Sequence, residues 1–336
     1  MAGTNFIPVV SSTLSADALV EWVLVHYSLP TPLTCHFLAH GINDSYLVST
    51  GDARYLLRVY TTGDHTPEQI EAEIAVLDAM HRHGVTATQS IVRHDGRHLT
   101  EIHAPEGLRH AVLFTFLEGQ IDHTATPEQS WYAGEALARF HRIFNGREPA
   151  FHRPYHNAQT LIDEPLTAIE AFTPFAAYQQ HFAYLREVTN QLKSEIALLP
   201  TTKPEYGLCH GDFMSGNLVW QGERPAIIDL DFCAYCWRVY DLATCLWLQV
   251  RHESNPRRAA QPIAHAFLQG YQSVRPLSSA ERRALPFFVL IRHIWLLGGS
   301  AIPRSARHGI AWLLGDFFEG FIAFIRAWLE DPTALE

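Results

Sequence analysis

The sequence predicts an α+β protein of two lobes, in which a small antiparallel sheet with one helix precedes a mainly helical region. Three observations support this prediction. Short runs with strand-like composition occupy most of the chain up to about residue 117 and surround one amphipathic helix. After Glu118 and Gly119, apolar residues recur mainly at helical spacing. The 336 residues, 47% of them hydrophobic, suffice for one large or two moderate cores.

The first lobe, residues 1–117, is expected to contain one sheet and one helix. The helix begins at Thr66, which can cap it while Pro67 takes the first helical position and Gln69 closes a capping box. Gly84 is expected to end this helix. Strands are predicted at Thr34–His40, Asp44–Thr50, Ala53–Tyr60, Ser90–His94, Leu99–His103 and His110–Leu117.

The second lobe, residues 118–336, is expected to be mainly helical. Thr126, Pro127 and Gln129 repeat the capping pattern and open a helix that runs to about Phe144. Further helices are predicted at about Phe175–Leu198 and, from Asp241 onward, through Leu268, Leu285–Leu297 and Gly309–Leu329. Pro149–Pro174 is expected to be irregular, and Tyr206–Asp231 to form strands and loops.

Charge and cysteine content limit the class of protein. The net charge of −10, with His neutral, argues against a basic surface that binds nucleic acid. Five cysteines, an odd number, indicate a reducing compartment with free thiols. Cys233 and Cys236 form a CxxC pair, but a zinc site would need two more ligands at similar spacing. We therefore favour packing over metal or redox chemistry for this pair.

The sequence carries no evident targeting or membrane-spanning segment. The first residues, MAGTNFIPVV, lack the basic start and long apolar core of a signal peptide. The longest apolar stretch, Phe287–Gly299, is interrupted by Arg292 and His293 and is too short to span a bilayer. We expect a soluble cytoplasmic protein without a membrane or nucleic-acid partner, and the oligomeric state stays open.

The segment 206–231, YGLCHGDFMSGNLVWQGERPAIIDLD, carries the polar residues that indicate chemistry. Apolar runs on either side of a turn near residue 223 predict a β-hairpin. A hairpin centred there places Asn217 opposite Asp229, so that an amide oxygen and a carboxylate lie side by side. Hard oxygen ligands of this kind suit a Mg²⁺ ion that also holds phosphate.

Asp212 lies five residues before Asn217, in a loop with two glycines, and can reach the same space. A carboxylate beside a metal–phosphate site is well placed to orient and deprotonate a hydroxyl. Asp, Asn and Gly are also common in turns. Turn formation alone does not explain five polar groups at these spacings, which are His210, Asp212, Asn217, Asp229 and Asp231.

These motifs resemble the aminoglycoside phosphotransferase and choline kinase family, which has the protein-kinase-like fold. The resemblance rests on HGDFMSGN, IIDLD and YDLA at 240–243, with GINDSYLV at 41–48, YLLRVY and LARFHRI at 137–143 in support. It covers nearly the whole chain. Within the family, residues 270–286 resemble type II homoserine kinases, and residues 152–166 resemble the bacterial stress-response kinases.

The resemblance implies roles for the polar residues. Asp212 matches the catalytic-loop carboxylate that positions and activates the acceptor hydroxyl, and Asn217 and Asp229 match the metal ligands. Asp231 lies where some branches have a second acidic group, so we include it among the candidate metal ligands. His210 matches the structural histidine of the loop, and we group it with Asp212 as a catalytic residue.

Two further matches concern charged groups that organise the site. Asp241 matches a carboxylate that braces the catalytic loop. Glu73 fits the helix glutamate that pairs with a basic residue on the preceding strand, where Arg58 stands instead of the usual lysine. Arginine can still hold phosphate, through a planar fork rather than a point charge, and the chain has only two lysines, at 193 and 203. Glu71 is a competing candidate for the pair.

The resemblance also assigns nucleotide-binding positions in the first lobe. The loop His40–Ser45 would cover the phosphates, with Gly41, Asn43, Asp44 and Ser45 as candidate binding residues. Glu118 lies where the backbone would bind adenine. A Walker A loop is excluded, because the chain has no Gly-Lys pair.

The resemblance implies a kinase that uses ATP and Mg²⁺ to phosphorylate a hydroxyl of a small molecule. Homoserine, another amino alcohol, an aminoglycoside and a sugar are all compatible acceptors. Two alternatives stay open at this point. The first is a Ser/Thr protein kinase of the stress-response type, and the second is a nucleotide-binding protein without catalytic activity.

Overall fold

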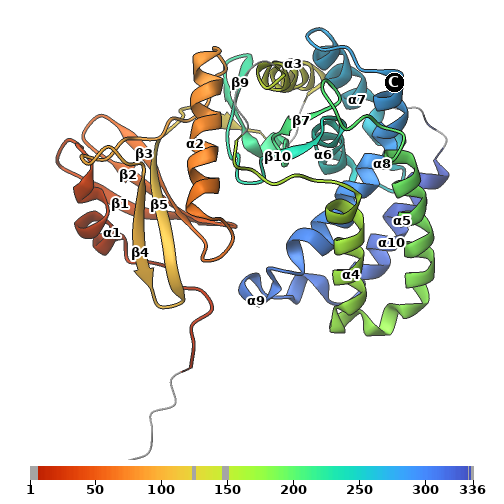
Figure 1. Cartoon of the computed structure of the whole chain (residues 1–336), viewed down its shortest axis with the longest axis horizontal. Helices are drawn as coiled ribbons and strands as arrows, with labels where there is room; N and C mark the ends of the chain where they lie inside the picture. The colour runs from red at the N-terminus through yellow and green to blue at the C-terminus, as the bar shows by residue number, and fades with distance from the viewer. Residues whose placement is uncertain (1–6, 123–125, 146–150, 332, 334–336) are drawn as a thin grey trace, which may run out of the picture. The chain divides into compact units, whose positions relative to one another are not determined.

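The computed structural model describes residues 7–122, 126–145, 151–331 and 333 of the chain. The chain divides into two compact units, Met1–Glu118 and Gly119–Glu336 (Figure 1). The first unit contains an antiparallel sheet with helices, and the second is mainly helical with short strands.

The N-terminal unit is built on a five-stranded antiparallel sheet in the order β1-β2-β3-β5-β4. Its elements are α1 (Ala16–Trp22), a 3₁₀ turn (Leu24–His26), β1 (Thr34–His40), β2 (Asp44–Ser49), β3 (Arg54–Tyr60), α2 (Pro67–Arg82), β4 (Leu99–Ala104) and β5 (Gly107–Thr115).

The sheet lies between α1 and α2 (Figure 1). Alternate residues of a strand face opposite sides of its sheet, so Leu57 and Val59 point to one side and Arg58 to the other. The side with Leu57 and Val59 forms an apolar core with Leu19 and Val23 of the α1 region. The opposite side turns Arg58 toward α2.

Helix α2 has the capping box that the sequence predicted. The Thr66 side chain accepts a hydrogen bond from the Gln69 backbone N–H, and the Gln69 side chain accepts one from the Thr66 backbone N–H. The apolar stripe of this helix is buried in the unit, as its spacing predicted: Ile70, Ile74, Leu77 and Met80. This packing fixes the face that Glu73 presents to the sheet.

Two N-terminal expectations were incomplete. Helix α1 was not predicted, because seven residues with Leu19 as their buried residue give too short a periodic pattern. The strand predicted at Ser90–His94 was wrong: this segment has one isolated bridge, from Ser90 to Phe114, and no regular ladder. Side-chain composition marked it as strand-like, but strand formation depends on a partner along its length.

The C-terminal unit consists of helices around two small antiparallel sheets, β10-β7 and β6-β8-β9. Its strands are β6 (Gln120–Ile121), β7 (Tyr206–Cys209), β8 (Leu218–Gln221), β9 (Arg224–Ile227) and β10 (Ala234–Trp237). Its α-helices are α3 (Pro127–Ile143), α4 (Glu164–Ala171), α5 (Phe182–Ile196), α6 (Val239–Val250), α7 (Pro256–Gln272), α8 (Ser279–Trp295), α9 (Ser305–His308) and α10 (Phe317–Glu330). Its 3₁₀ and π segments are Gln159–Asp163, Thr173–His181, Ser215–Asn217, Leu296–Ala301 and Ala311–Leu313.

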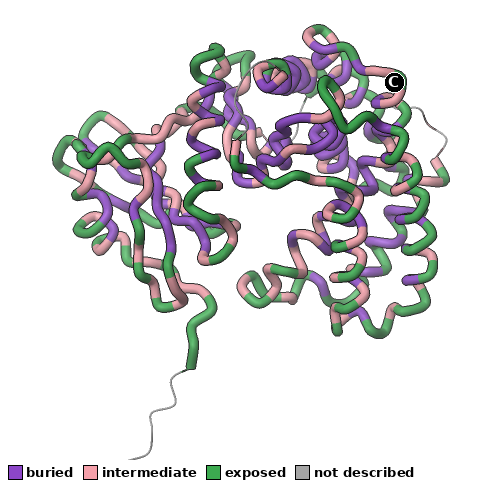
Figure 2. Tube along the Cα trace, in the orientation of Figure 1, coloured by how far each residue is buried: buried purple, intermediate pink, exposed green. Residues whose placement is uncertain are grey.

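Helices α3 and α7 pack against each other through two glycines. A Cβ atom on Gly134 would lie 2.0 Å from the Phe267 carbonyl oxygen, and one on Gly270 would lie 1.9 Å from that of Trp131. Neither position has room for a side chain, so the two backbones approach closely. Helix α6 is almost entirely buried beside these helices and the β7-β10 pair (Figure 2). The site residues on α3 and α6 are therefore held in a rigid core.

The region predicted as irregular, Pro149–Pro174, contains a helix, so that expectation was wrong over Gln159–Ala171. Pro165 lies in the first turn of α4, where backbone N–H groups have no partner within the helix, so its missing N–H costs no hydrogen bond. Residues 149 and 150 lie outside the described residues. The predicted helix Phe175–Leu198 is α-helical only from Phe182, after a 3₁₀ segment.

Within the described ranges, one helix, Ser279–Ala301, is long and apolar enough to cross a membrane by length and composition alone. Of its most apolar stretch, 67% is buried inside the protein, and this burial is typical of a core helix. The helix includes Arg292, which is buried.

Candidate active site

The loop His210–Asn217 follows β7 and is held by the carboxylate of Asp241 at the start of α6. Asp241 Oδ2 accepts a hydrogen bond from the His210 backbone N–H at 2.7 Å, and Oδ1 accepts one from Gly211 at 2.8 Å. Gly211 has φ +82°, and a Cβ there would lie 2.0 Å from the Phe232 carbonyl oxygen. The loop therefore turns sharply at a position that only glycine fits, with both neighbouring peptide groups fixed.

The imidazole of His210 also supports this loop. Its Nδ1 accepts a hydrogen bond from the Asp212 backbone N–H at 3.3 Å, and its Nε2 donates to the Ile228 carbonyl at 3.0 Å. This pattern requires the neutral ring with the proton on Nε2. His210 is fully buried, so it connects the loop to the hairpin, as the structural histidine was expected to do.

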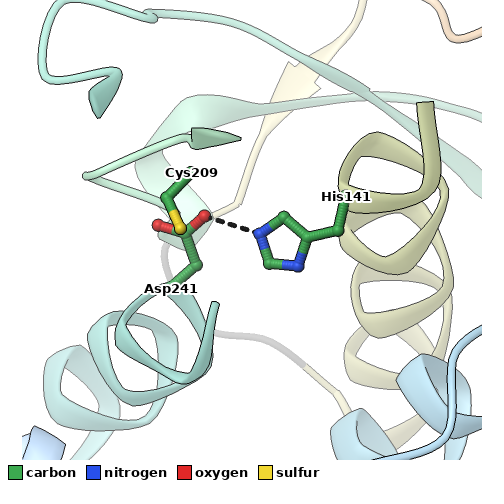
Figure 3. A group of neighbouring side chains, drawn as sticks. All are labelled: His141, Cys209 and Asp241. Carbon is green, nitrogen blue, oxygen red and sulfur yellow. Dashed lines mark hydrogen bonds and ion pairs between the residues drawn. The ribbon is translucent and has the colours of Figure 1, made fainter. Parts of the chain in front are cut away.

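Asp241 belongs to a buried group with His141 of α3 and Cys209 of β7 (Figure 3). His141 Nε2 lies 2.9 Å from Asp241 Oδ2, and His141 Nδ1 lies 2.7 Å from the Tyr271 hydroxyl. Arg275 donates to the same hydroxyl at 3.2 Å. Each group thus donates to the next, from Arg275 through Tyr271 and His141 to Asp241.

Hydrogen bonds occupy both nitrogens of His141 and both oxygens of Asp241, which opposes metal binding, although the ligand atoms of this group lie within 4.8 Å of one another. Burial raises the pKa of Cys209 well above its usual value, which keeps the thiol protonated. Burial lowers the pKa of His141 to about 3, so the ring is neutral at pH 7. Burial alone would raise the pKa of Asp241, but the hydrogen bonds from His141 and the Gly211 N–H, together with nearby electrostatic effects, outweigh it and the net shift is downward. The group braces the loop.

Asp212 is held from both sides. Its Oδ1 accepts a short hydrogen bond from the Arg292 guanidinium of α8. Its Oδ2 accepts one from the Asn217 side-chain amide at 3.1 Å, and the same amide donates to the Asp212 carbonyl at 2.8 Å. A carboxylate that faces donors on both oxygens acts as an acceptor only. Asp212 is therefore fixed in position as an anion.

The hairpin that carries Asn217 has a different register from the predicted one. Leu218 pairs with Ile227 and Gln221 with Arg224, which centres the turn between residues 222 and 223. Asn217 therefore faces Ile228, whose N–H donates to the Asn217 carbonyl at 3.0 Å. The expectation that Asn217 lies opposite Asp229 was wrong by one residue, because the turn has two residues instead of three.

Asp229 follows Ile228 directly and has φ +62°, the single positive φ outside glycine among the described residues. A non-glycine residue in this conformation is strained, and such strain is concentrated at functional sites. The kink turns the chain out of the hairpin immediately after the residue that faces Asn217. The two candidate metal ligands are therefore brought to the same end of the hairpin by register and kink together.

The turn after Asp229 is held by Arg153. Its Nε donates to the Cys233 carbonyl at 2.6 Å, and its Nη2 donates to the Leu230 carbonyl at 3.1 Å and to that of Asp231. Arg153 is buried, so these carbonyls replace water as its partners. The side chain of Asp231 is buried as well, and its role as a metal ligand stays a prediction.

The cysteine pair Cys233 and Cys236 is buried in the same region. The Cys209 thiol lies 3.5 Å from the Cys236 carbonyl, and all five cysteines are free thiols. These contacts agree with the expectation that the pair contributes to packing.

In the N-terminal unit, the structure pairs Arg58 with Glu73. Arg58 Nη1 lies 3.1 Å from Glu73 Oε1, and the Tyr60 hydroxyl donates to Glu73 Oε2 at 3.0 Å. The side chain of Glu73 is 3% exposed, whereas Glu71 is exposed on the other face of α2. The expected pair is confirmed in its contacts, and its role toward a nucleotide stays a prediction.

The four candidate residues of the phosphate-covering loop lie at the β1–β2 turn. Asn43 Oδ1 accepts a hydrogen bond from the Thr61 N–H at 3.0 Å. Asp44 is buried, and its carboxylate pairs with Arg109 at 2.8 Å. These side chains anchor the turn to the sheet. Phosphate binding by Gly41, Asn43, Asp44 and Ser45 stays a prediction.

Glu118 ends the N-terminal unit. Its carboxylate forms an exposed ion pair with Arg54, whose Nε lies 2.8 Å from Oε1. This contact holds the Glu118 side chain against the sheet. Adenine binding by the backbone at Glu118 stays a prediction.

Arg292 and Arg153 are the residues that sequence reasoning missed. In the sequence, Arg292 is only a charge that interrupts an apolar stretch. A charge inside an apolar helix was the available signal, because a buried arginine needs a buried partner. Arg153 had no comparable signal, since it lies in a segment without regular pattern.

Comparisons with known proteins agree with this arrangement. A family model described as the phosphotransferase enzyme family matches residues 34–277, well over half of the chain. The chain is 33% identical over 300 residues to an uncharacterized protein of Synechocystis sp., with 88% of this chain and 80% of that protein covered. It is 29% identical over 318 residues to a homoserine kinase of Bradyrhizobium diazoefficiens, with 90% and 87% covered.

Two solved structures are similar over nearly the full length. A microcompartment-associated aminopropanol kinase gives a TM-score of 0.75 at 22% identity, with 93% of this chain and 95% of that chain covered. An amicoumacin kinase, solved in complex with AMP-PNP and Ca²⁺, gives a TM-score of 0.74 at 18% identity, with 96% and 95% covered.

The fold and the family match define a kinase of the protein-kinase-like fold. The chain belongs to the phosphotransferase enzyme family, as a small-molecule phosphotransferase. Both conclusions agree with the fold and the family that the sequence predicted.

Proposed function

We propose that the protein uses ATP and Mg²⁺ to phosphorylate a hydroxyl of a small molecule, which is an amino alcohol such as homoserine or an aminoglycoside-like acceptor. The observation that supports this proposal best is the geometry of Asp212. Its carboxylate is fixed between Arg292 and Asn217, in a loop that Asp241 braces. The similarity to a homoserine kinase supports the acceptor class.

In the proposed reaction, the acceptor oxygen forms a bond to the γ-phosphorus of ATP while the bond to the β–γ bridging oxygen breaks and ADP leaves. Asp212 accepts the hydrogen bond of the acceptor hydroxyl and takes its proton as the new bond forms. Since phosphoryl transfer depends mostly on positioning and charge neutralisation, a rigidly held carboxylate suits this role.

The residues around Asn217 fit a Mg²⁺ ion. The Asn217 Nδ2 group donates to Asp212, which leaves its amide oxygen on the opposite side. Asp229 supplies a carboxylate one residue beyond the Asn217–Ile228 contact. Amide and carboxylate oxygens are the hard ligands that Mg²⁺ binds together with phosphate. Asn217 and Asp229 would hold the ion, with Asp231 as a further candidate, and the ion would neutralise phosphate charge.

Nucleotide binding is assigned to residues of the N-terminal unit. Arg58, oriented by Glu73, would hold phosphate oxygens through its guanidinium fork. Gly41, Asn43, Asp44 and Ser45 would form the turn over the phosphates, and the backbone at Glu118 would bind the base. A cytoplasmic location, without membrane or nucleic-acid partners, stays a prediction from the sequence.

The proposal is tested by measuring ADP release from Mg²⁺-ATP with a panel of acceptors: homoserine, choline, ethanolamine, hydroxylysine, aminoglycosides, sugars and a generic protein substrate. Asp212→Asn is measured in parallel and is expected to lower kcat by roughly 10²–10⁴-fold, the range of a positioned general base. An acceptor-dependent rate that this substitution abolishes supports the proposal and names the acceptor.

The same panel distinguishes the alternatives. Phosphorylation of the protein substrate, or autophosphorylation, without any small-molecule rate would indicate a protein kinase instead. ATP binding without turnover on any acceptor would favour a nucleotide-binding protein without catalysis. Activity of Asp212→Asn within tenfold of the wild type would remove Asp212 from the proposed role.

A further inference from the structure

Arg292 is a fully buried charge in the core of the C-terminal unit. Its side chain is 1% exposed, and its guanidinium lies over two indole rings, 5.8 Å from the centroid of Trp247 and 5.3 Å from that of Trp295. It belongs to α8, and its neighbours along the helix are apolar or aromatic except for His293. The sequence therefore places a cation where the surroundings favour an apolar side chain.

The hydrogen bonds of Arg292 converge on the loop that carries Asp212. One terminal nitrogen contacts Asp212 Oδ1, and the other donates to the Gly211 carbonyl at 3.2 Å and to the Tyr240 hydroxyl at 3.3 Å. The guanidinium thus holds both the Asp212 carboxylate and the peptide group that precedes it. Two contacts from one planar group fix the orientation of the carboxylate as well as its position.

Stability alone does not account for this arrangement. The Nε–H of Arg292 is buried without a hydrogen-bond partner among the described residues. A buried donor without a partner costs free energy, and well-packed apolar residues are often as stabilising as a buried ion pair. The retained charge therefore indicates a role that depends on Asp212.

The two oxygens of Asp212 have different surroundings. Oδ1 faces Arg292, which lies in the core, so it is directed toward the interior of the unit. Oδ2 accepts one hydrogen bond from Asn217, at 3.1 Å. A carboxylate oxygen has two lone pairs, so Oδ2 can accept one further hydrogen bond. The side chain as a whole is 15% exposed, so a small molecule can reach it.

We propose that Arg292 is a positioning residue for phosphoryl transfer, which holds Oδ1 of Asp212 so that Oδ2 accepts the hydrogen bond of the acceptor hydroxyl. This inference rests on the proposed function, because it requires Asp212 to bind the acceptor. It adds the residue that orients the carboxylate and the oxygen that takes the proton. Arg292 itself acts only through Asp212.

The test compares Arg292→Met and Arg292→Lys with the wild type in the ADP-release assay, using the acceptor found in the panel. Met keeps most of the volume and removes the charge, and Lys restores a charge without the planar fork. We expect Arg292→Met to lower kcat by about 10²-fold, because small displacements of a catalytic group have effects of this size. Arg292→Lys is expected to recover about tenfold of that loss. In both variants, the KM for ATP is expected to stay within about threefold of the wild-type value.

Arg238→Met is the matched control. Arg238 is also fully buried, but its guanidinium donates to the Pro204 and Leu208 carbonyls and to Asn145, and not to the loop. We expect a lower Tm for Arg238→Met, as for Arg292→Met, with kcat within about threefold of the wild type.

Three results would overturn the inference, and they are distinguishable. If Arg292→Met and Arg292→Lys both keep kcat within threefold while Asp212→Asn is inactive, the positioning role is wrong and the proposed function stands. If Arg238→Met lowers kcat as much as Arg292→Met, the effect reflects a loosened core. If Asp212→Asn stays active, or the wild type shows no acceptor-dependent turnover, the proposed function and this inference fail together.

Discussion

His141 and Asp241 form a hydrogen bond of 2.9 Å between Nε2 and Oδ2, and both side chains are fully buried (Figure 3). Helix α3 supplies the imidazole and helix α6 the carboxylate, so the bond joins two helices behind the loop His210–Asn217. The same carboxylate holds the His210 and Gly211 backbone. The stability of the core and the shape of the loop therefore depend on one buried anion and its neutral partner.

The neutral state of His141 predicts that the protein loses stability on mild acidification. Burial lowers the pKa of His141 to about 3, below its ordinary value of 6.5. Below pH 6.5 the unfolded chain binds a proton at this residue and the folded chain does not. The free energy of unfolding should therefore fall with pH between about 6.5 and 3, by up to about 1.4 kcal/mol per pH unit from this residue.

Urea unfolding at pH 7.5, 6.5, 5.5 and 4.5 measures this slope. His141→Gln removes the titrating group, so its unfolding free energy should depend less steeply on pH than that of the wild type. His152→Gln is the control, since His152 is exposed and solvent surrounds it in both states. An unchanged slope in His141→Gln would show that this histidine does not contribute to the acid sensitivity.

Asp241→Asn should damage both stability and activity. The asparagine side chain has the same shape as that of Asp241, but an NH₂ group replaces one of the two acceptor oxygens. This NH₂ group would face a backbone N–H, which is also a donor. We expect a loss of unfolding free energy of about 1.5–3 kcal/mol, the size of a hydrogen bond to a charged group, because the partner His141 is neutral. The kcat should fall as well, because the loop is no longer held. Asp52→Asn, at an exposed turn of the N-terminal unit, should change neither quantity, and a similar loss there would remove the specific role of Asp241.

Asp229→Gly should separate metal binding from stability. At φ +62° a glycine is unstrained, whereas Asp229 is strained. Relief of this strain should raise the free energy of unfolding by about 1 kcal/mol, which offsets the loss of side-chain contacts. We expect the Tm to stay close to that of the wild type. Mg²⁺-dependent nucleotide binding should be lost, because a ligand is removed. Calorimetric titration of AMP-PNP with and without Mg²⁺ measures this, and an unchanged affinity would contradict the metal assignment.

Glu73→Gln should weaken ATP binding through Arg58. The carboxylate orients the Arg58 guanidinium across a 3.1 Å contact, and the amide holds it less firmly. We expect the KM for ATP to rise about tenfold, equivalent to about 1.4 kcal/mol, with a smaller change in the KM for the acceptor. Glu71→Gln, on the exposed face of the same helix, is the control and should match the wild type. Equal effects of the two substitutions would indicate a general change in charge.

Much of the site could be predicted because its residues are close in sequence or have strong local signals. The loop from His210 to Asn217 is defined by residue types within eight positions. The capping boxes at Thr66 and Thr126 form as predicted, since a capping box involves residues only three positions apart. The spacing on α2 also favoured Glu73 over Glu71, and the structure has the Glu73 contact.

Errors arose where a local pattern did not determine the geometry. The hairpin register differs by one residue because the turn length depends on the ladder that forms, and residue types alone do not fix it. Helix α4 was missed because a proline in its first turn resembles an irregular segment.

The sequence by itself determined the two-lobe α+β architecture of this protein. It also determined a set of side chains, namely one carboxylate, one amide and further acidic groups, that is typical of a phosphotransferase. Only the tertiary structure decided how these groups are held. Arg292 contacts Asp212 from 80 positions away, and Arg153 reaches the turn after Asp229 from a similar separation. Such contacts depend on how whole helices pack, and no local spacing of residues records that packing.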